Sequence, residues 1–143
     1  MTMDSVAEAR VALVTGANRG LGFETARQLL AKGLSVVLAG RDAAALARAH
    51  RSLAEADRRR AITVQMDVTS VESITAAQRA VTEQVGSIDV LVNNAAVLLG
   101  ENDDVLSIPT DEYRRTLETN LFGVIEVCRA FVPGMDNVGS AMP

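Results

Sequence analysis

The sequence predicts an α/β fold in which a doubly wound parallel sheet is covered by helices on both faces. Short apolar runs alternate strictly with longer segments of helical periodicity. The runs are apolar throughout, as strands covered on both faces must be. The chain has 143 residues, the usual size of one domain, and 48% of them are hydrophobic, which is enough for a sizeable core. We therefore expect one domain over residues 1–143.

Each strand is predicted from an apolar run that turn residues follow directly. The four expected strands are residues 11–15, 35–39, 61–66 and 88–92. Strands that alternate with helices along the chain run parallel and are joined by right-handed crossovers. In the doubly wound arrangement the four strands, numbered along the chain, take the order 3-2-1-4.

Each helix is predicted from its start and stop signals. The four expected helices are residues 20–32, 43–56, 71–86 and 110–132. Gly33 ends the first helix and Asp42 caps the second. Thr69 and Glu72 have the spacing of a capping box at the start of the third helix, and Pro133 stops the fourth.

The fourth helix carries apolar residues on two sides. One expected stripe consists of Leu117, Leu121, Val124, Cys128 and Phe131. Outside it lie Phe122, Ile125 and Val132. Such a helix needs the sheet against one side and something else against the other, and the fourth strand is an open edge in the predicted order. We therefore expect the chain alone to aggregate or to fold only in part.

Charge and composition exclude several classes of partner. The net charge is −4 and is spread along the chain, so nothing favours nucleic-acid binding. The one basic run, Arg58 to Arg60, is interpreted as a solvated turn. No run of 18 apolar residues and no leader-like N-terminus is present, which predicts a cytoplasmic protein that does not span a membrane.

Composition also limits the chemistry. The single cysteine, Cys128, excludes an internal disulfide and a cysteine-based zinc site. The only histidine, His50, lies in an alanine-rich helical stretch without a nucleophile motif, so a hydrolase triad is not expected. The acidic loop with Glu101, Asp103 and Asp104 is interpreted as solvated, and no metal site is predicted.

The turn after the first strand holds three glycines between a strand and a helix. Gly16 allows a tight turn, Gly20 lets backbone N–H groups approach a pyrophosphate at the helix N-terminus, and Gly22 lets helix and strand pack closely. This predicts a Rossmann-like dinucleotide site with contacts from Gly16, Asn18, Arg19, Gly20, Leu21 and Gly22. A turn without a ligand is the alternative, whereas a P-loop is excluded because no lysine follows the glycines.

The end of the second strand favours NADP over NAD. NAD sites place an acidic residue there for the ribose 2′-hydroxyl, whereas this chain has Gly40 followed by Arg41. Arg19 can reach the same 2′-phosphate, and two guanidinium groups suit a doubly charged ligand. Asp42 argues the other way, although its position as a helix cap accounts for it.

Together these residues resemble the short-chain dehydrogenase/reductase family, particularly its NADP-dependent carbonyl-reductase-like members. The resemblance covers nearly all of residues 11–133. Besides the glycine turn, it rests on Asp67-Val68, which resembles the pair that contacts adenine, and on Asn93-Asn94-Ala95 after the fourth strand. The family motif ends in glycine where this chain has Ala96. By resemblance, Asp67, Val68, Asn94 and Ala95 belong to the cofactor site.

The resemblance also implies a catalytic residue. Asn120, within Thr119-Asn120-Leu121, falls where the family has the asparagine of its Asn-Ser-Tyr-Lys set. In the family, a tyrosine acts as general acid/base with its pKa lowered by a lysine four residues later. Here Leu117 follows four residues after Tyr113, and the only lysine is Lys32. Ser140 in the tail resembles the family serine only faintly.

The sequence therefore predicts the N-terminal, cofactor-binding part of an NADP-dependent short-chain oxidoreductase. The whole protein is expected to interconvert a carbonyl and an alcohol by hydride transfer and to form a homo-oligomer, as relatives do. The chain as given is expected to be inactive. Two alternatives stay open: a non-catalytic protein that binds NADP or a partner subunit, and a truncated product without function.

Overall fold

A computed structural model describes residues 9–100 and 104–135 of the chain. Four parallel strands form one sheet in the order β3-β2-β1-β4, which confirms the predicted topology. The strands are β1 (Val11–Thr15), β2 (Ser35–Gly40), β3 (Ala61–Gln65) and β4 (Val90–Val92). In the register of the sheet, Leu13 lies between Val37 on β2 and Leu91 on β4.

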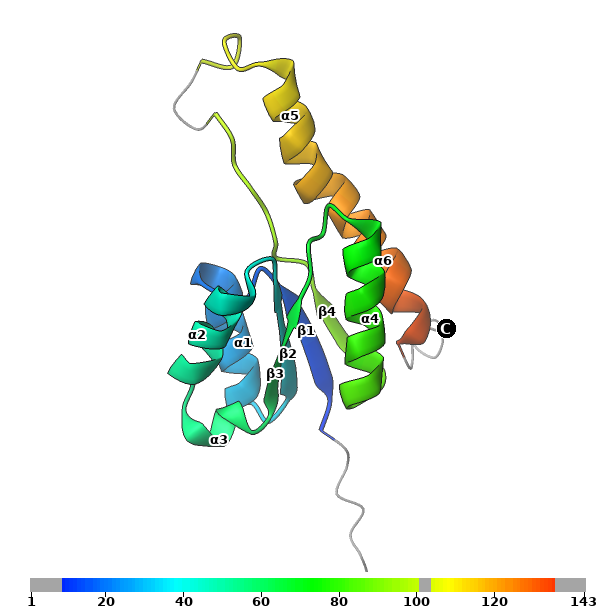
Figure 1. Cartoon of the computed structure of the whole chain (residues 1–143). Helices are drawn as coiled ribbons and strands as arrows, with labels where there is room; N and C mark the ends of the chain where they lie inside the picture. The colour runs from blue at the N-terminus through cyan, green and yellow to red at the C-terminus, as the bar shows by residue number, and fades with distance from the viewer. Residues whose placement is uncertain (1–8, 101–103, 136–143) are drawn as a thin grey trace, which may run out of the picture.

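Helices cover both faces of this sheet, so the fold is Rossmann-like. They are α1 (Gly20–Ala31), α2 (Ala43–Ser52), α3 (Glu55–Arg58), α4 (Val71–Val85), α5 (Thr110–Leu117) and α6 (Val124–Phe131). Figure 1 shows α1 and α2 on one face, α4 and α6 on the other, and α5 projecting beyond the sheet.

The core is divided into two layers because successive strand residues point to opposite faces. Ala12 and Val14 on β1 pack with Leu30 of α1 on one side of the sheet. Leu13, between them, packs with Ile74 of α4 and Val127 of α6 on the other side. All six side chains are buried. The alternation of β1 thus ties both helical layers to one central strand.

The predicted helix over residues 43–56 is confirmed as far as Ser52 and is wrong only in its last four residues. The chain leaves the helical conformation at Leu53 (φ −69°, ψ 152°), and a separate short helix, α3, follows. Leu53 is buried in the core with Leu46 and Ala49, and burial of this side chain outweighs the helix propensity of its neighbours. The basic run is also more ordered than predicted, because Arg58 ends α3 and half-buried Arg60 donates to the Leu34 carbonyl at 2.9 Å.

The predicted capping box at the third helix is wrong as well. Ser70 caps α4, and its hydroxyl accepts a hydrogen bond from the Ser73 N–H at 3.2 Å. The hydroxyl of Thr69 instead donates to the carboxylate of Asp67 at 2.7 Å. Three neighbouring residues here carry side chains able to cap, and the spacing with Glu72 selected the wrong one. The far end agrees with the prediction, since Gly86 ends α4 with a φ of 78°.

The strand β4 is shorter than predicted and begins at Val90. Just before it, the backbone N–H of Asp89 donates to the Val11 carbonyl at 2.8 Å. The carboxylate of Asp89 accepts from the Val11 N–H, also at 2.8 Å. A side chain thus replaces the backbone partner that a longer strand would offer to Val11.

The predicted helix over residues 110–132 is interrupted in the middle. A π-helical segment, η1 (Glu118–Gly123), joins α5 to α6, and a 3-10 turn, η2 (Val132–Gly134), ends the run at Pro133 and Gly134. A π turn inserts an extra residue and so rotates the faces of the helix on its two sides. The buried face consists of Thr119, Gly123, Val127 and Phe131.

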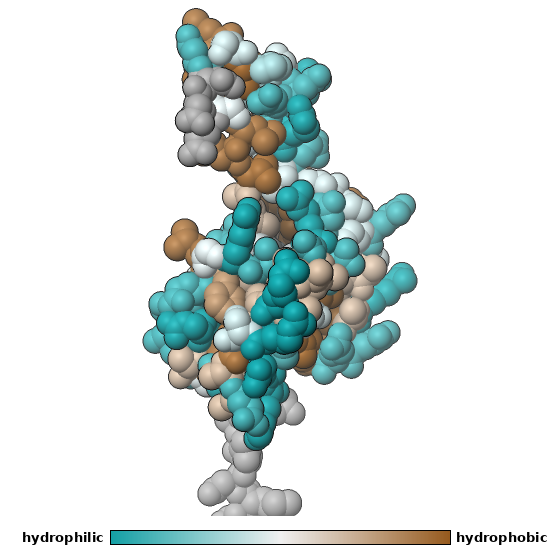
Figure 2. Space-filling view, turned by 60° about the vertical axis from the view of Figure 1, so that its left-hand side comes forward, coloured by the Kyte–Doolittle hydropathy of each residue, from teal (hydrophilic) through white to brown (hydrophobic). Residues whose placement is uncertain are grey.

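The predicted apolar stripe is therefore correct only in part. Phe131 is buried, whereas Leu117 and Leu121 are each 47% exposed. Figure 2 shows apolar side chains gathered on the part of the molecule that projects above the sheet. Exposed large side chains on and beside this segment include Leu98, Val105, Leu106, Leu117 and Leu121. In the described residues, no helix has the length and apolarity that a membrane crossing would require.

Candidate functional site

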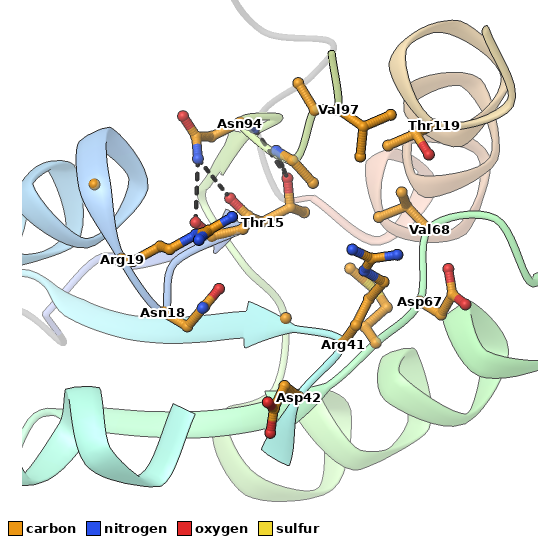
Figure 3. Close-up of a pocket in the computed structure, with 16 residues that line it drawn as sticks. Thr15, Asn18, Arg19, Arg41, Asp42, Asp67, Val68, Asn94, Val97 and Thr119 are labelled. Atoms are coloured by element: carbon orange, nitrogen blue, oxygen red, sulfur yellow. Dashed lines mark hydrogen bonds between the residues drawn. The ribbon is translucent and has the colours of Figure 1, made fainter. Parts of the chain in front are cut away.

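A cavity of about 440 Å³ opens at the carboxyl ends of the strands (Figure 3). Its walls come from the turns and loops that follow all four strands. From β1 the chain crosses one way to β2 and β3, and then returns to the other side as β4. Such a point of reversal in a doubly wound sheet is where these folds bind ligands.

Most of the predicted cofactor residues line this cavity. They are Gly16, Asn18, Arg19, Gly20, Arg41, Asp67, Val68, Asn94 and Ala95. Three predicted site residues do not line it, namely Leu21, Gly22 and Asn120. Leu21 is 81% exposed, and Gly22 is buried behind the turn. Asn120 follows Thr119, which does form part of the wall.

The glycine turn needs glycine at each of its three positions. Gly16 and Gly20 have positive φ angles of 61° and 59°, which other residues rarely adopt. A Cβ atom at Gly22 would collide with the carbonyl oxygen of Gly16 and with the side-chain amide of Asn94. Gly22 therefore serves close packing of helix and turn, as predicted, without facing the cavity itself.

The N-terminus of α1 differs from the N-termini of α2 and α4. Those two helices receive side-chain caps from Asp42 and Ser70. The residue in the same position of α1 is Arg19, which makes no capping hydrogen bond, and the first turn of α1 has no acidic residue. The backbone N–H groups of this turn and the positive end of the helix dipole are therefore left for an anion in the cavity.

The loop after β4 is anchored on the glycine turn through Thr15. The Thr15 hydroxyl accepts hydrogen bonds from the backbone N–H groups of Asn94 and Ala95, each at 2.9 Å. The side-chain amide of Asn94 donates to the carbonyls of Thr15 and Gly16, both at 3.2 Å (Figure 3). The amide of Asn94 thus holds the two turns together. Asn93 is exposed, and its amide lies 3.5 Å from the sulfur of Cys128.

Two arginines and two carboxylates supply the charge of the cavity. Arg19 comes from the glycine turn and Arg41 from the end of β2, where Gly40 stands at the position that is acidic in NAD sites. Figure 3 shows the guanidinium group of Arg41 directed into the cavity on the side of Asp67 and Val68. The side-chain amide of Gln65 donates to the Arg41 carbonyl at 3.0 Å and fixes the backbone there.

The carboxylates have different surroundings. One oxygen of Asp42 accepts from the Ala45 N–H at 3.0 Å, which confirms the predicted helix cap. The pKa of Asp67 is lowered, mainly because the Thr69 hydroxyl donates to its carboxylate; the Thr69 N–H and the charge of Arg41 act in the same direction, and burial opposes them. Asp67 is therefore an anion near neutral pH.

Asn120 binds the loop after β4 from the π-helical segment. Its side-chain oxygen accepts from the Val97 N–H and its side-chain nitrogen donates to the Val97 carbonyl, both at 2.8 Å. This reciprocal pair satisfies the amide in the way a strand partner would. Val97 and Thr119 line the cavity, so Asn120 fixes the wall from behind.

The predicted set of site residues leaves out seven lining residues, although the argument for NADP already weighs Gly40 and Asp42. They are Thr15, Gly40, Asp42, Met66, Ala96, Val97 and Thr119. A hydroxyl residue at the end of an apolar strand, such as Thr15, is a signal that was available. No sequence signal places Val97 and Thr119 at the cavity, because their position depends on the contact between η1 and the loop after β4.

The remaining sequence predictions concern His50, the acidic loop and Ser140. His50 is half-buried and its Nε2 lies 3.0 Å from the Ala61 carbonyl oxygen, a contact between α2 and β3. Glu101, Asp103 and Ser140 lie outside the described residues. Within residues 9–100 and 104–135, no group of three or more histidine, cysteine, aspartate or glutamate side chains is arranged to hold a metal ion.

The fold and the cavity define a nucleotide-binding protein of the Rossmann-like class. A family model of short chain dehydrogenases matches residues 10–142. The chain therefore belongs to the short-chain dehydrogenase family of oxidoreductases.

Known relatives agree with this assignment. Trans-4-hydroxycyclohexanecarboxylate dehydrogenase of Sinomonas cyclohexanicum is 40% identical over an alignment of 148 residues, which covers 97% of this chain and 54% of the relative. Carbonyl reductase 1 (NADPH) of Mus musculus is 39% identical over 124 residues, covering 86% of this chain and 44% of the relative. The chain thus spans about half the length of the curated relatives it matches.

Solved structures show the same partial match. An alcohol dehydrogenase from Thermococcus sibiricus, complexed with 5-hydroxy-NADP, superposes with a TM-score of 0.80 at 31% identity, covering 89% of this chain and 53% of that one. A 3-ketoacyl-(acyl-carrier-protein) reductase from Brucella melitensis, complexed with NADH, superposes with a TM-score of 0.79 at 30% identity, covering 87% and 50%.

Proposed function

We propose that this chain is the N-terminal, cofactor-binding part of an NADP-dependent short-chain oxidoreductase that interconverts a carbonyl and an alcohol. The bound nicotinamide supplies or takes up the hydride. The observation that carries the preference for NADP is the end of β2, where Gly40 leaves room and Arg41 brings a positive charge into the cavity beside Arg19.

The preference follows from charge. The 2′-phosphate of NADP is doubly negative, and two guanidinium groups bind such a group more strongly than one. Asp42 repels it, but one oxygen of this carboxylate is occupied as the cap of α2. Relatives support a nicotinamide cofactor in either form, since the Thermococcus enzyme was crystallised with an NADP derivative and the Brucella reductase with NADH.

The other predicted residues then take the following roles. Gly16, Asn18, Gly20, Leu21 and Gly22 form the turn and helix N-terminus against the pyrophosphate. Asp67 and Val68 contact the adenine ring, while Asn94 and Ala95 form the wall beyond the pyrophosphate. The single domain is incomplete with respect to the relatives, so the substrate pocket depends on residues beyond this chain.

Asn120 is the proposed catalytic contribution of this chain. Because its side-chain amide is occupied by Val97, it acts by holding the π-helical segment and the cavity wall in place for a proton relay. The chain has no tyrosine–lysine pair at the family spacing, since Leu117 follows Tyr113 and the only lysine is Lys32. We therefore propose that the chain alone turns over no substrate.

The whole protein is proposed to act on a small carbonyl or alcohol in the cytoplasm, as a homo-oligomer, without nucleic acid or membrane. Family membership and the names of relatives, such as the mouse carbonyl reductase, support the substrate class. The exposed apolar side chains on and beside α5, such as Leu106 and Leu117, support self-association.

Cofactor titration tests the proposal. Dissociation constants of NADPH and NADH are measured for the wild-type chain, Arg41→Ala and Arg19→Ala, with Arg59→Ala as a control at an exposed arginine paired with Glu55. Each cavity variant is expected to weaken NADPH about tenfold or more, as loss of one charge-assisted contact predicts, and NADH much less. Equal losses for both cofactors would contradict the preference for NADP.

Inactivity is tested on the same samples. NADPH and a generic aldehyde are added to the wild-type chain and to Asn120→Ala, and NADPH oxidation is followed by absorbance. No turnover is expected from either. Turnover by the wild-type chain that Asn120→Ala abolishes would show that the catalytic set is complete without the missing pair.

A further inference from the structure

The loop between β3 and α4 is fixed by hydrogen bonds at almost every polar group of Asp67. Its backbone N–H donates to the Ser73 hydroxyl at 2.9 Å. Its carbonyl accepts from the Ser70 N–H at 3.1 Å. The position of Asp67 at the cavity is therefore set by the start of α4.

The two oxygens of the Asp67 carboxylate have different surroundings. Oδ1 accepts two hydrogen bonds from Thr69, one from its N–H at 2.9 Å and one from its hydroxyl at 2.7 Å. Oδ2 has no hydrogen-bond partner among the residues that the structure describes. Within the same part of the chain, the backbone N–H of the next residue, Val68, is also without one. Both residues line the cavity.

Thr69 thus leaves one oxygen of Asp67 free and keeps that oxygen an acceptor. A carboxylate that receives two donors on one oxygen stays ionised, and the lowered pKa of Asp67 has the Thr69 hydroxyl as its main cause. The other charged groups lining the cavity are Arg19, Arg41 and Asp42, and of these Arg41 also lowers the pKa of Asp67.

An acceptor beside a donor matches one edge of a 6-aminopurine. The 6-amino group of adenine donates, and its N1 accepts. A 6-oxopurine such as hypoxanthine has the opposite pattern, with an acceptor at position 6 and a donor at N1. An ionised carboxylate repels a 6-oxo group and has no proton to offer it.

We propose that Thr69 is a positioning residue that makes the nucleotide pocket selective for a 6-aminopurine over a 6-oxopurine by orienting the carboxylate of Asp67. This inference rests on the proposed function, because it takes the purine of the cofactor to lie against Asp67 and Val68. It goes beyond that function in assigning the selectivity to an exposed threonine outside the cavity.

The test compares NADPH with the reduced form of nicotinamide hypoxanthine dinucleotide phosphate, which differs from NADPH only in the purine, where a 6-oxo group and an N1–H replace the 6-amino group and the bare N1. Dissociation constants of both are measured for the wild-type chain, Thr69→Val and Thr69→Ser. The wild type is expected to prefer NADPH. Thr69→Val removes one charge-assisted hydrogen bond and is expected to lower this preference about threefold to tenfold. Thr69→Ser keeps the hydroxyl and is expected to retain it.

The pH dependence of NADPH binding gives a second readout that a merely structural role would not move. In the wild type, binding weakens only when the pH falls through the lowered pKa of Asp67. Without the Thr69 hydroxyl that pKa rises, so Thr69→Val is expected to lose affinity at a higher pH than the wild type. The side-chain amide of Asp67→Asn can donate to a 6-oxo group and does not titrate. This variant is therefore expected to lose both the preference for NADPH and the pH dependence.

Thr75→Val is the matched control, because the Thr75 hydroxyl bonds within α4 to the Val71 carbonyl and does not reach Asp67. Circular dichroism checks that each variant is folded. An unchanged purine preference and pH profile in Thr69→Val, with NADPH still bound, would overturn this inference alone. A wild-type chain that binds neither NADPH nor NADH would overturn the proposed function together with it.

Discussion

Two regions of the molecule differ in how completely they are packed: the packed half, which contains β1 and β2, and the open half, which contains β4 and the segment that follows it. On the side of β1 and β2, the residues from Ala12 to Val14 and from Val36 to Ala39 are all buried. On the other side, the three residues of β4 are only half-buried, and the segment that follows exposes large apolar side chains. Leu106 is 91% exposed and Leu98 is 69% exposed.

This contrast separates what the chain completes by itself from what it leaves open. Burial of apolar surface contributes about 25 cal/mol per Å², so the fully buried residues of β1 and β2 each stabilise the fold more than the half-buried residues of β4 do. The cavity takes its walls from both sides, and its glycine turn and Asp67 loop are held by internal hydrogen bonds. Large exposed apolar patches are typical of surfaces that pack against further protein, which agrees with the self-association proposed above.

The largest effect is expected from a change in the packed half. In Gly22→Ala, the new Cβ meets the backbone carbonyl of Gly16 and the amide of Asn94, and the carbonyl cannot move without opening the turn. We expect loss of NADPH binding and a destabilisation above about 3 kcal/mol, the upper end for ordinary overpacking. Chemical denaturation and cofactor titration measure both. Gly134→Ala, where a Cβ has open space, is the control and should leave both unchanged.

A smaller effect is expected where the two halves meet. Thr15→Val keeps the shape of a side chain that is 2% exposed but removes the acceptor for the N–H groups of Asn94 and Ala95. An unpaired buried donor costs about 1–3 kcal/mol, so the free energy of unfolding should fall by at least that much. Thr15→Ser, which keeps the hydroxyl, should recover most of it. Equal stability of the valine variant and the wild type would show that this hydroxyl does not join the two turns.

The smallest effect on stability is expected in the open half. Leu121→Gln changes a side chain that is 47% exposed, so the free energy of unfolding should stay within about 0.5 kcal/mol of the wild type. Self-association, measured by sedimentation velocity, should decrease. Val127 in α6 is fully buried, and Val127→Ala provides the contrast by lowering stability without reducing association. A large loss of stability in Leu121→Gln would mean that the segment is packed within the chain.

The sequence predicts the packed half better than the open half. The positions of the strands, the glycine turn and the C-terminal ends of α1 and α4 follow from local patterns, because apolar runs and turn residues determine them. The break at Leu53 does not, since a tertiary contact overrides local helix propensity there. The choice of Ser70 over Thr69 as the cap depends on Asp67, whose carboxylate competes for the threonine.

The candidate site shows the same division. Gly16, Gly20, Arg19 and Arg41 can be predicted as cavity residues, because each has a chemical reason that the sequence displays. The part of the site formed by η1 cannot be predicted in this way, because a π turn shifts the helix faces by one residue and no periodic pattern reveals that shift. The bond from Asn120 to Val97 spans 23 residues and was correspondingly out of reach, although Asn120 itself was singled out.

The Thr15 hydroxyl also determines how fast hydrogen exchange with solvent proceeds in the loop after β4. Loop amides usually exchange rapidly because they bond to water. The amides of Asn94 and Ala95 instead share one acceptor that is buried at the end of β1. Their protons are released only when the end of β1 and the loop separate. Two loop amides should therefore exchange as slowly as those of the central strand, and their exchange rate reports directly on the opening of the sheet at the cofactor end.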